Sequence, residues 1–213
     1  MEKEKQIKLT QEIVETSYRL LINKLAHGGL SANNEAAFQL ELGFILKTIG
    51  QLYEFRLVDK FQLEFETYID LSETSIKSNT TRARVDILLK YRDNETSTAA
   101  AIELKFFKKA NHREPNNRYD AFKDISNLEL YKNQGSIDLC YFIVSTDHLH
   151  YVNQESYSSD TADFDIRNGR DYIAGTVLEY RTENPYGPNI TLKQNYSFNW
   201  QTIGSWHYLK LKV

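Results

Sequence analysis

The sequence predicts an α/β protein of the α+β type, in which helices flank a central sheet. Apolar residues recur at helical spacing over residues 9–27 and 34–53. Shorter runs rich in β-branched and aromatic residues, bounded by polar turn residues, are typical of strands. The sequence contains four such runs before residue 150, at residues 61–69, 82–91, 99–105 and 137–144.

Composition indicates one globular domain spanning residues 1–213. Hydrophobic residues make up 41% and charged residues 26% of the chain, which is ordinary for a soluble protein with a sizeable core. The net charge of −3 gives no whole-molecule attraction for nucleic acid, so any such contact needs a local basic patch. The N-terminus lacks an apolar signal core, no run approaches the roughly 18 apolar residues of a membrane span, and the single Cys140 can form no internal disulfide. We therefore expect a cytoplasmic protein without a membrane partner.

Two helices are predicted before the first strand. The first, at residues 9–27, follows a charged tip that we expect to be frayed, and it could pack on the core or serve as a dimer arm. The second, at residues 34–53, starts at capping Ser and Asn residues. Glu35 and Glu41 lie at opposite edges of its apolar stripe, where carboxylates usually only solvate a helix.

Residues 82–105 are the stretch around which the rest of the chain is organised, because two strand patterns flank a polar break. If a tight hairpin is centred on Asn94 and Glu95, equal counting outward places Asp86 opposite Glu103. Side chains alternate faces along a strand, so Glu103 and Lys105 point the same way. Such a cluster suits a divalent ion, because buried charge is costly unless it is paired or bound to metal. The alternative is an ordinary cross-strand salt bridge on a solvated face.

A basic loop follows Lys105, where phosphate contacts would be wanted near such a site. Its cations outnumber Glu114, although a solvated loop of mixed charge is the alternative. The candidate nucleic-acid-binding residues are Lys108, Lys109, Arg113 and Arg118.

The third helix is predicted to start at a cap on Asn116 or Asn117 and to end near Gly135. Its Asp124 and Glu129 could orient Lys105 or a substrate, but surface acids are commoner and neither is assigned as catalytic.

After the third helix, residues 137–144 are almost continuously apolar, which predicts a central strand buried on both faces. A short helix is predicted at residues 147–152. His148 and His150 could bind metal, but packing or rim histidines are the favoured interpretation. Residues 156–213 form a β-rich extension, with strand patterns at residues 172–180, 190–200 and 206–213.

At Asp86, Glu103 and Lys105 the sequence resembles the PD-(D/E)XK phosphodiesterase superfamily, the restriction-endonuclease-like nucleases. The pattern there is an Asp on one strand and then Glu or Asp, any residue, and Lys on the next. Val85 stands where the name-giving Pro would be, a departure that many members share. The order helix, three strands, helix, strand over residues 34–144, about half the chain, also resembles the core of that superfamily, which has a central mixed sheet.

The resemblance implies metal-dependent hydrolysis of phosphodiester bonds, of a restriction or phage-defence type, with DNA the expected polymer because most relatives act on it. Asp86, Glu103 and the backbone carbonyl of Leu104 would hold Mg²⁺ or Mn²⁺. Lys105 would orient or deprotonate the attacking water and offset charge on the phosphorane. A Glu of the first core helix would complete the metal shell through water. The run from residue 34 to residue 43 resembles members in which the second Glu has that role, so we assign Glu41 and keep Glu35 as the alternative.

An alternative hypothesis, which involves no catalysis, is a silent module that binds nucleic acid or another protein through the same fold. A nuclease that an activating protein partner switches on is also left open, as is a homodimer that would cut both strands.

Overall fold

The computed structural model describes residues 1–71, 73–134 and 136–213. The helices are α1 (Lys3–Ala26), α2 (Glu35–Gln51), α3 (Glu114–Asn133) and the one-turn α4 (His150–Asn153). The long strands are β1 (Lys60–Asp70), β2 (Arg82–Arg92), β3 (Ser97–Phe107), β4 (Leu139–Thr146) and β10 (Trp206–Lys212). The short strands are β5 (Arg170–Tyr172), β6 (Val177–Leu178), β7 (Ile190–Thr191), β8 (Tyr196–Phe198) and β9 (Gln201–Ile203).

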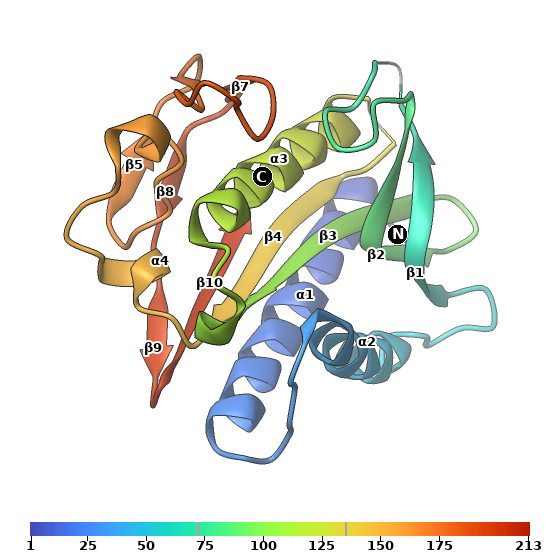
Figure 1. Ribbon diagram of the computed structural model, residues 1–213. Helices are drawn as coiled ribbons and strands as arrows, with labels where there is room; N and C mark the ends of the chain where they lie inside the picture. The colour runs from blue at the N-terminus through green and yellow to red at the C-terminus, as the bar shows by residue number, and fades with distance from the viewer. Residues whose placement is uncertain (72, 135) are drawn as a thin grey trace.

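A six-stranded mixed sheet forms the middle layer, in the order β1-β2-β3-β4-β10-β9. Only β3 and β4 are parallel neighbours within it, because α3 makes the crossover between them. One hydrophobic core lies between the sheet and α3, and a second lies between the sheet and the pair α1 and α2 (Figure 1). The predicted α+β class with helices on both faces of a central mixed sheet is therefore confirmed.

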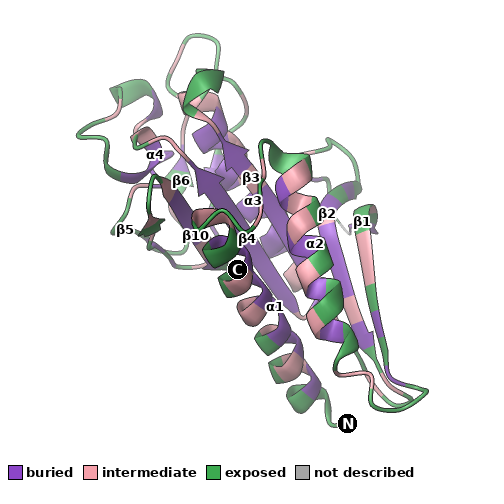
Figure 2. Ribbon diagram, turned by 90° about the horizontal axis from the view of Figure 1, so that it is seen from below, coloured by how far each residue is buried: buried purple, intermediate pink, exposed green. Residues whose placement is uncertain are grey.

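The strand β4 is buried at every position, and β3 at most positions (Figure 2). The prediction of a central strand at residues 137–144 is confirmed, with both ends displaced by two residues. Cores on both sides explain why this segment shows no apolar and polar alternation.

The β2–β3 hairpin has the predicted register. The backbone N–H of Asp93 donates to the carbonyl of Thr96 at 2.9 Å, so the turn is centred on Asn94 and Glu95. Pairing then runs from Arg92↔Ser97 to Ile87↔Ile102, and Asp86 and Glu103 are the next residues of the two strands.

The N-terminal end of α1 is ordered against this hairpin, so the expected frayed tip is wrong. The helix begins at Lys3 instead of residue 9. Gln6 donates to the carbonyl of Thr96 at 3.3 Å and accepts the hydroxyl of Thr98 at 2.9 Å. Lys3 pairs with Asp138 at 2.8 Å. These long-range polar contacts hold a segment whose own pattern is only charged.

The helix α2 packs closely on β1 because two glycines face aromatic rings. A Cβ added at Gly43 would lie 2.2 Å from the ring of Phe65, and one at Gly50 would lie 2.4 Å from the ring of Phe61. Phe61 is buried, whereas Phe65 is 42% exposed. β1 is an edge strand, and the ring of Phe65 lies against α2 at Gly43.

The helix α3 starts at Glu114 with Pro115 in its first turn, and not at a cap on Asn116 or Asn117. It ends at Asn133, and the predicted end at Gly135 lies outside the described residues.

The C-terminal extension differs from its prediction. Residues 172–180 and 190–200 contain only the short strands β5 to β8, in two small sheets, while β10 joins the main sheet beside β4. Aromatic packing joins this region to α3, since the ring centroid of Phe122 lies 5.3 Å from that of Tyr172 and 5.6 Å from that of Phe198. Within the described part of the chain, no helix combines the length and hydropathy required to cross a membrane.

Candidate active site

Asp86, Glu103 and Lys105 come together where β2 and β3 separate beyond their last paired residues. One carboxylate oxygen of Asp86 accepts the backbone N–H of Leu104 at 2.6 Å, which ties the end of the β2 ladder to β3. Glu103 is completely buried. A carboxylate in that position needs a charged or hydrogen-bonding partner, because burial removes its hydration.

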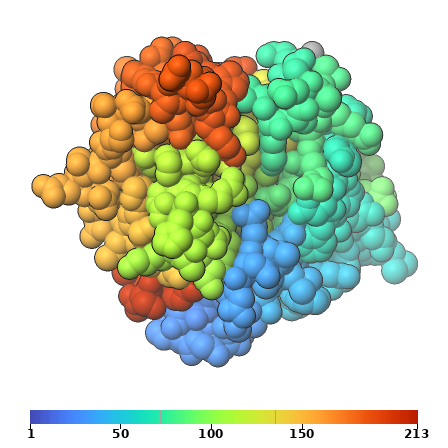
Figure 3. Space-filling model, in the orientation of Figure 1, coloured from blue at the N-terminus to red at the C-terminus, as the bar shows by residue number. Residues whose placement is uncertain are grey.

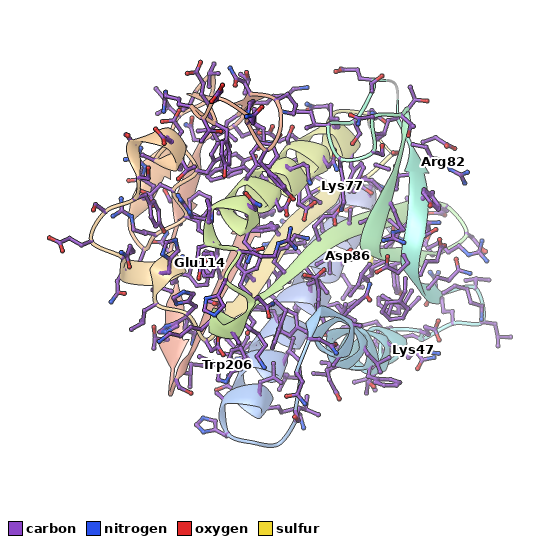
Figure 4. The ribbon with its side chains drawn as sticks, viewed as in Figure 1. Lys47, Lys77, Arg82, Asp86, Glu114 and Trp206 are labelled. Atoms are coloured by element: carbon purple, nitrogen blue, oxygen red, sulfur yellow. The ribbon has the colours of Figure 1, made fainter. Side chains whose placement is uncertain are left out.

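Two lysines supply the positive charge. The Nζ of Lys105 lies 2.5 Å from Asp124 Oδ2 and donates to the Leu104 carbonyl at 3.0 Å. The Nζ of Lys77 donates to Glu103 Oε2 at 2.7 Å and lies 3.1 Å from Asp124 Oδ1. Lys77 comes from the segment between β1 and β2, and Figure 4 shows it with Asp86 in the space between α3 and the strands.

Asp124 thus binds both lysines, one through each oxygen, and it is only 1% exposed. The expectation that Asp124 is a surface acid is wrong. Because α3 crosses over the sheet beside β3, this helix face is internal.

The helix carboxylate at the cluster is Glu35, so the preference for Glu41 is wrong as to position. Glu35 lies in the first turn of α2 and its Oε2 accepts the backbone N–H of Phe106, next to Lys105, at 3.2 Å. Glu41 instead lines a groove between α1 and α2, beside Leu20 and Lys24. The N-terminal end of α2, and not its middle, is directed at the site.

Gln39, four residues after Glu35 and on the same helix face, also reaches the cluster. Its Nε2 donates to the carbonyl of Asp86 at 2.7 Å and to Glu66 at 3.0 Å. The β1–β2 ladder pairs the residues on either side of Glu66 and Asp86 but not these two. Glu66 has a φ of 51°. Gln39 therefore takes the carbonyl that strand pairing leaves, and the i, i+4 pair with Glu35 was the available sequence signal.

The pKa values of three carboxylates in the cluster are raised above their ordinary values. Burial raises the pKa of Glu103 well above its ordinary value, and the charge of Asp124 raises it further. Partial loss of hydration also raises the pKa of half-buried Asp86 and of Glu35, against the opposing charge of Lys105, although Glu35 as a whole residue remains exposed.

For the two lysines and Asp124, the neighbouring charges shift the pKa more than burial does. Burial would lower the pKa of each lysine, but Asp124 and the other carboxylates raise both above the ordinary value. Burial would raise the pKa of Asp124, and the two ammonium groups bring it below its ordinary range. Both lysines are therefore charged at neutral pH.

The chemistry of the donor set fits a hard divalent cation. Four carboxylates, from Glu35, Asp86, Glu103 and Asp124, face two ammonium groups, and oxygen ligands are those that Mg²⁺ and Mn²⁺ prefer. In residues 1–71, 73–134 and 136–213, however, no three His, Cys, Asp or Glu side chains are arranged to hold a metal as they stand. The ammonium groups of Lys77 and Lys105 lie among the carboxylates, so a metal bound there would require these ammonium groups to move.

An open cavity of about 430 Å³ adjoins the cluster. It lies between the start of α2 and the start of α3, on the face seen in Figure 3, and its lining includes Lys105, Lys108 and Arg113. Lys109 is exposed nearby. Lys108, Lys109 and Arg113 of the predicted basic loop therefore lie where a phosphate backbone could be contacted.

Arg118 is not part of that surface, so its assignment as a nucleic-acid contact is wrong. It is 2% exposed and donates to the carbonyls of Thr161 and Phe164 at 3.0 and 2.8 Å. Its guanidinium also stacks on Tyr157, 3.6 Å from the ring centroid. The first turns of α3 direct Arg118 inward, where it fastens the segment after α4.

Other polar residues singled out in the sequence have structural partners. Glu129, expected at the surface, is buried and accepts the hydroxyl of Tyr196 at 2.7 Å. His148 contacts Glu114 at 3.0 Å, and burial lowers the pKa of His150 to about 4. Packing is therefore the better interpretation of both histidines.

The chain matches no protein-family model, no curated protein and no solved structure. The geometry and charge of the cluster are therefore the grounds for a function. Lys77 lies in a polar connection without periodicity, so the sequence carries no local signal for its position in the cluster.

Proposed function

We propose that this protein is a metal-dependent nuclease that hydrolyses phosphodiester bonds of DNA, of a restriction or phage-defence type. The observation that carries the proposal is the convergence of Asp86, Glu103 and Lys105 from adjacent strands, with Glu35 from the preceding helix. The order α2, β1, β2, β3, α3, β4 and the sheet order β1-β2-β3-β4 also agree with a restriction-endonuclease-like core. Buried acids and lysines with strongly perturbed pKa values beside an open cavity are typical of catalytic sites.

Asp86, Glu103 and the Leu104 carbonyl would hold Mg²⁺ or Mn²⁺, with Glu35 in the outer-shell role first assigned to Glu41. A bound metal of this kind supplies Lewis acidity to a phosphate and lowers the pKa of water.

The protein's own groups have separate tasks. The ammonium of Lys105 stays charged among its carboxylates, so offsetting negative charge on the phosphorane suits it better than deprotonating water. Asp124 fixes the position of that ammonium. Lys108 and Arg113 would neutralise neighbouring phosphates from the wall of the cavity.

A partner-activated or catalytically silent module is the second candidate. The contact between Lys77 and Glu103 favours it, because this lysine holds a carboxylate that the nuclease needs for metal. A protein partner that shifts the segment carrying Lys77 would then switch the enzyme on.

Plasmid cleavage in Mg²⁺ and in Mn²⁺ tests the nuclease proposal. We expect the wild type to cut, and Asp86→Ala and Lys105→Ala proteins to be inactive although folded by circular dichroism. Glu35→Ala should lower the rate on the order of 100-fold, as loss of an outer-shell group does. Glu41→Ala, on the same helix but away from the cluster, is the matched control and should cut within about threefold of the wild type.

Cleavage that survives in Asp86→Ala would contradict the proposed site. A wild type that leaves DNA intact in both metals, but binds Mn²⁺ through Asp86 in calorimetry, would favour the partner-activated candidate. Absence of both cutting and metal binding would favour the silent module.

A further inference from the structure

The segment between β1 and β2 is docked on α3 by a buried serine. Ser75 is completely buried, and its hydroxyl donates to Asn127 Oδ1 at 2.6 Å. The same hydroxyl accepts the backbone N–H of Lys77 at 3.0 Å, and the Ser75 carbonyl accepts the N–H of Asn79 at 2.8 Å. This turn directs the side chain of Lys77 into the cluster.

Lys77 pairs with both Glu103 and Asp124, and its shorter contact is with Glu103. Asp124 already has Lys105 at 2.5 Å, whereas the closest charged contact of Glu103 is Lys77 at 2.7 Å. The hydroxyl of Tyr131, which also donates to Glu103, is farther away at 3.4 Å. The ammonium therefore lies in contact with a carboxylate oxygen on which a metal site would depend.

We propose that Lys77 is a built-in competitor for the divalent cation, which occupies Glu103 in the metal-free protein and leaves that carboxylate when metal binds. This inference rests on the metal-dependent function proposed above. Two cations in contact with one buried carboxylate repel each other strongly, because the surroundings screen them poorly. Residues 73–81 consequently set the metal affinity, although none of them is a metal ligand.

Calorimetric titration of Mn²⁺ into the protein tests the competition without an activity readout. We expect Lys77→Met to bind Mn²⁺ about tenfold more tightly than the wild type, comparable to other changes beside metal ligands. Lys90→Met is the matched control, because Lys90 also pairs with a strand carboxylate, Glu64 at 2.8 Å, but outside the cluster. Its affinity should equal that of the wild type. Adding Asp86→Ala to Lys77→Met should abolish binding.

Lys77→Gln provides a second variant, since it removes the charge but keeps a hydrogen-bond donor for the buried carboxylates. It should also bind Mn²⁺ more tightly, and thermal melts establish that each variant is folded. Hydrogen exchange of the wild type gives an independent readout: Mn²⁺ should speed exchange of the amides in residues 73–81 as Lys77 is released.

The outcomes separate the inference from the function on which it rests. Equal Mn²⁺ affinity in wild type and both Lys77 variants would overturn the competition and leave the nuclease proposal standing. Weaker binding in the variants would overturn it too, since Lys77 would then hold Glu103 in place for the metal. Binding by no protein at all would overturn both the competition and the metal-dependent function.

Discussion

Asp124 is the residue on which the charge cluster depends most. It is a buried acid that contacts two ammonium groups from different parts of the chain, Lys77 and Lys105. Breaking a buried ion pair by removing one partner is costly, because the remaining charge loses its compensation without regaining water. Here one carboxylate compensates two cations, so its removal affects both.

We therefore expect Asp124→Asn to lower the free energy of unfolding by about 3 kcal/mol or more. The matched control is Asp120→Asn on the same helix, where Asp120 pairs with Lys123 one turn away at 2.6 Å. That local pair should contribute less than about 1 kcal/mol. Urea unfolding followed by circular dichroism measures both. Equal losses in the two variants would mean that the cluster contributes no more than this local, partly buried pair.

Sequence patterns could place Asp86, Glu103 and Lys105 because a hairpin turn and a period of two fix which residues face each other. They could not place Glu35 or Lys77. Glu35 and Glu41 are both plausible edges of one helical stripe, and the choice depends on which end of α2 meets the strands. The position of Lys77 depends on the hydrogen bond between Ser75 and Asn127, which are 52 residues apart in the sequence. No local pattern encodes such a contact.

At the level of elements, the position of α2 on β1 follows from two glycines that bring the helix close to the strand. Ala is a better helix former than Gly by about 1 kcal/mol, so helix propensity alone favours Ala at both positions. Close packing opposes it, because an added Cβ overlaps the ring of Phe61 at Gly50 and that of Phe65 at Gly43. The two rings differ in their freedom to move, since Phe61 is 8% exposed and Phe65 is 42% exposed.

Gly50→Ala should accordingly destabilise the protein by about 1 to 3 kcal/mol through overpacking. Gly43→Ala should change stability by less than about 1 kcal/mol, because the exposed ring of Phe65 can turn away while the helix gains propensity. Thermal unfolding measured by calorimetry compares the two. Gly43→Ala proving the more damaging would show that β1 is held rigidly at Phe65.

The elements that the sequence predicts well are those with strong local signals. The β2–β3 hairpin and the buried β4 have a turn or a continuous apolar run of their own. The segments predicted as strands at residues 172–180 and 190–200 are mostly irregular, and the rings of Tyr172 and Phe198 pack on Phe122 of α3. Propensity describes such a segment poorly, since tertiary packing decides its conformation.

For the molecule as a whole, the net charge of −3 means that attraction to a polyanion has to come from a local group of cations. Lys108 and Arg113 line the cavity beside the cluster, and Lys109 is exposed nearby. The fourth predicted cation, Arg118, is buried and fastens the C-terminal segment to α3. DNA binding should therefore depend on the first three and be indifferent to the fourth.

Salt dependence of DNA binding distinguishes these roles, because each neutralised phosphate adds about 0.9 to the slope of log affinity against log salt concentration. In the Asp86→Ala background, which prevents cutting, we expect Lys108→Ala and Arg113→Ala each to reduce the slope by about that amount at unchanged thermal stability. Arg118→Met should leave the slope unchanged and lower the melting temperature, since it removes buried hydrogen bonds. Fluorescence anisotropy with a labelled duplex measures the slopes. Slopes that stay the same in Lys108→Ala and Arg113→Ala would place the DNA on another face of the protein and remove the cavity from the proposed substrate path.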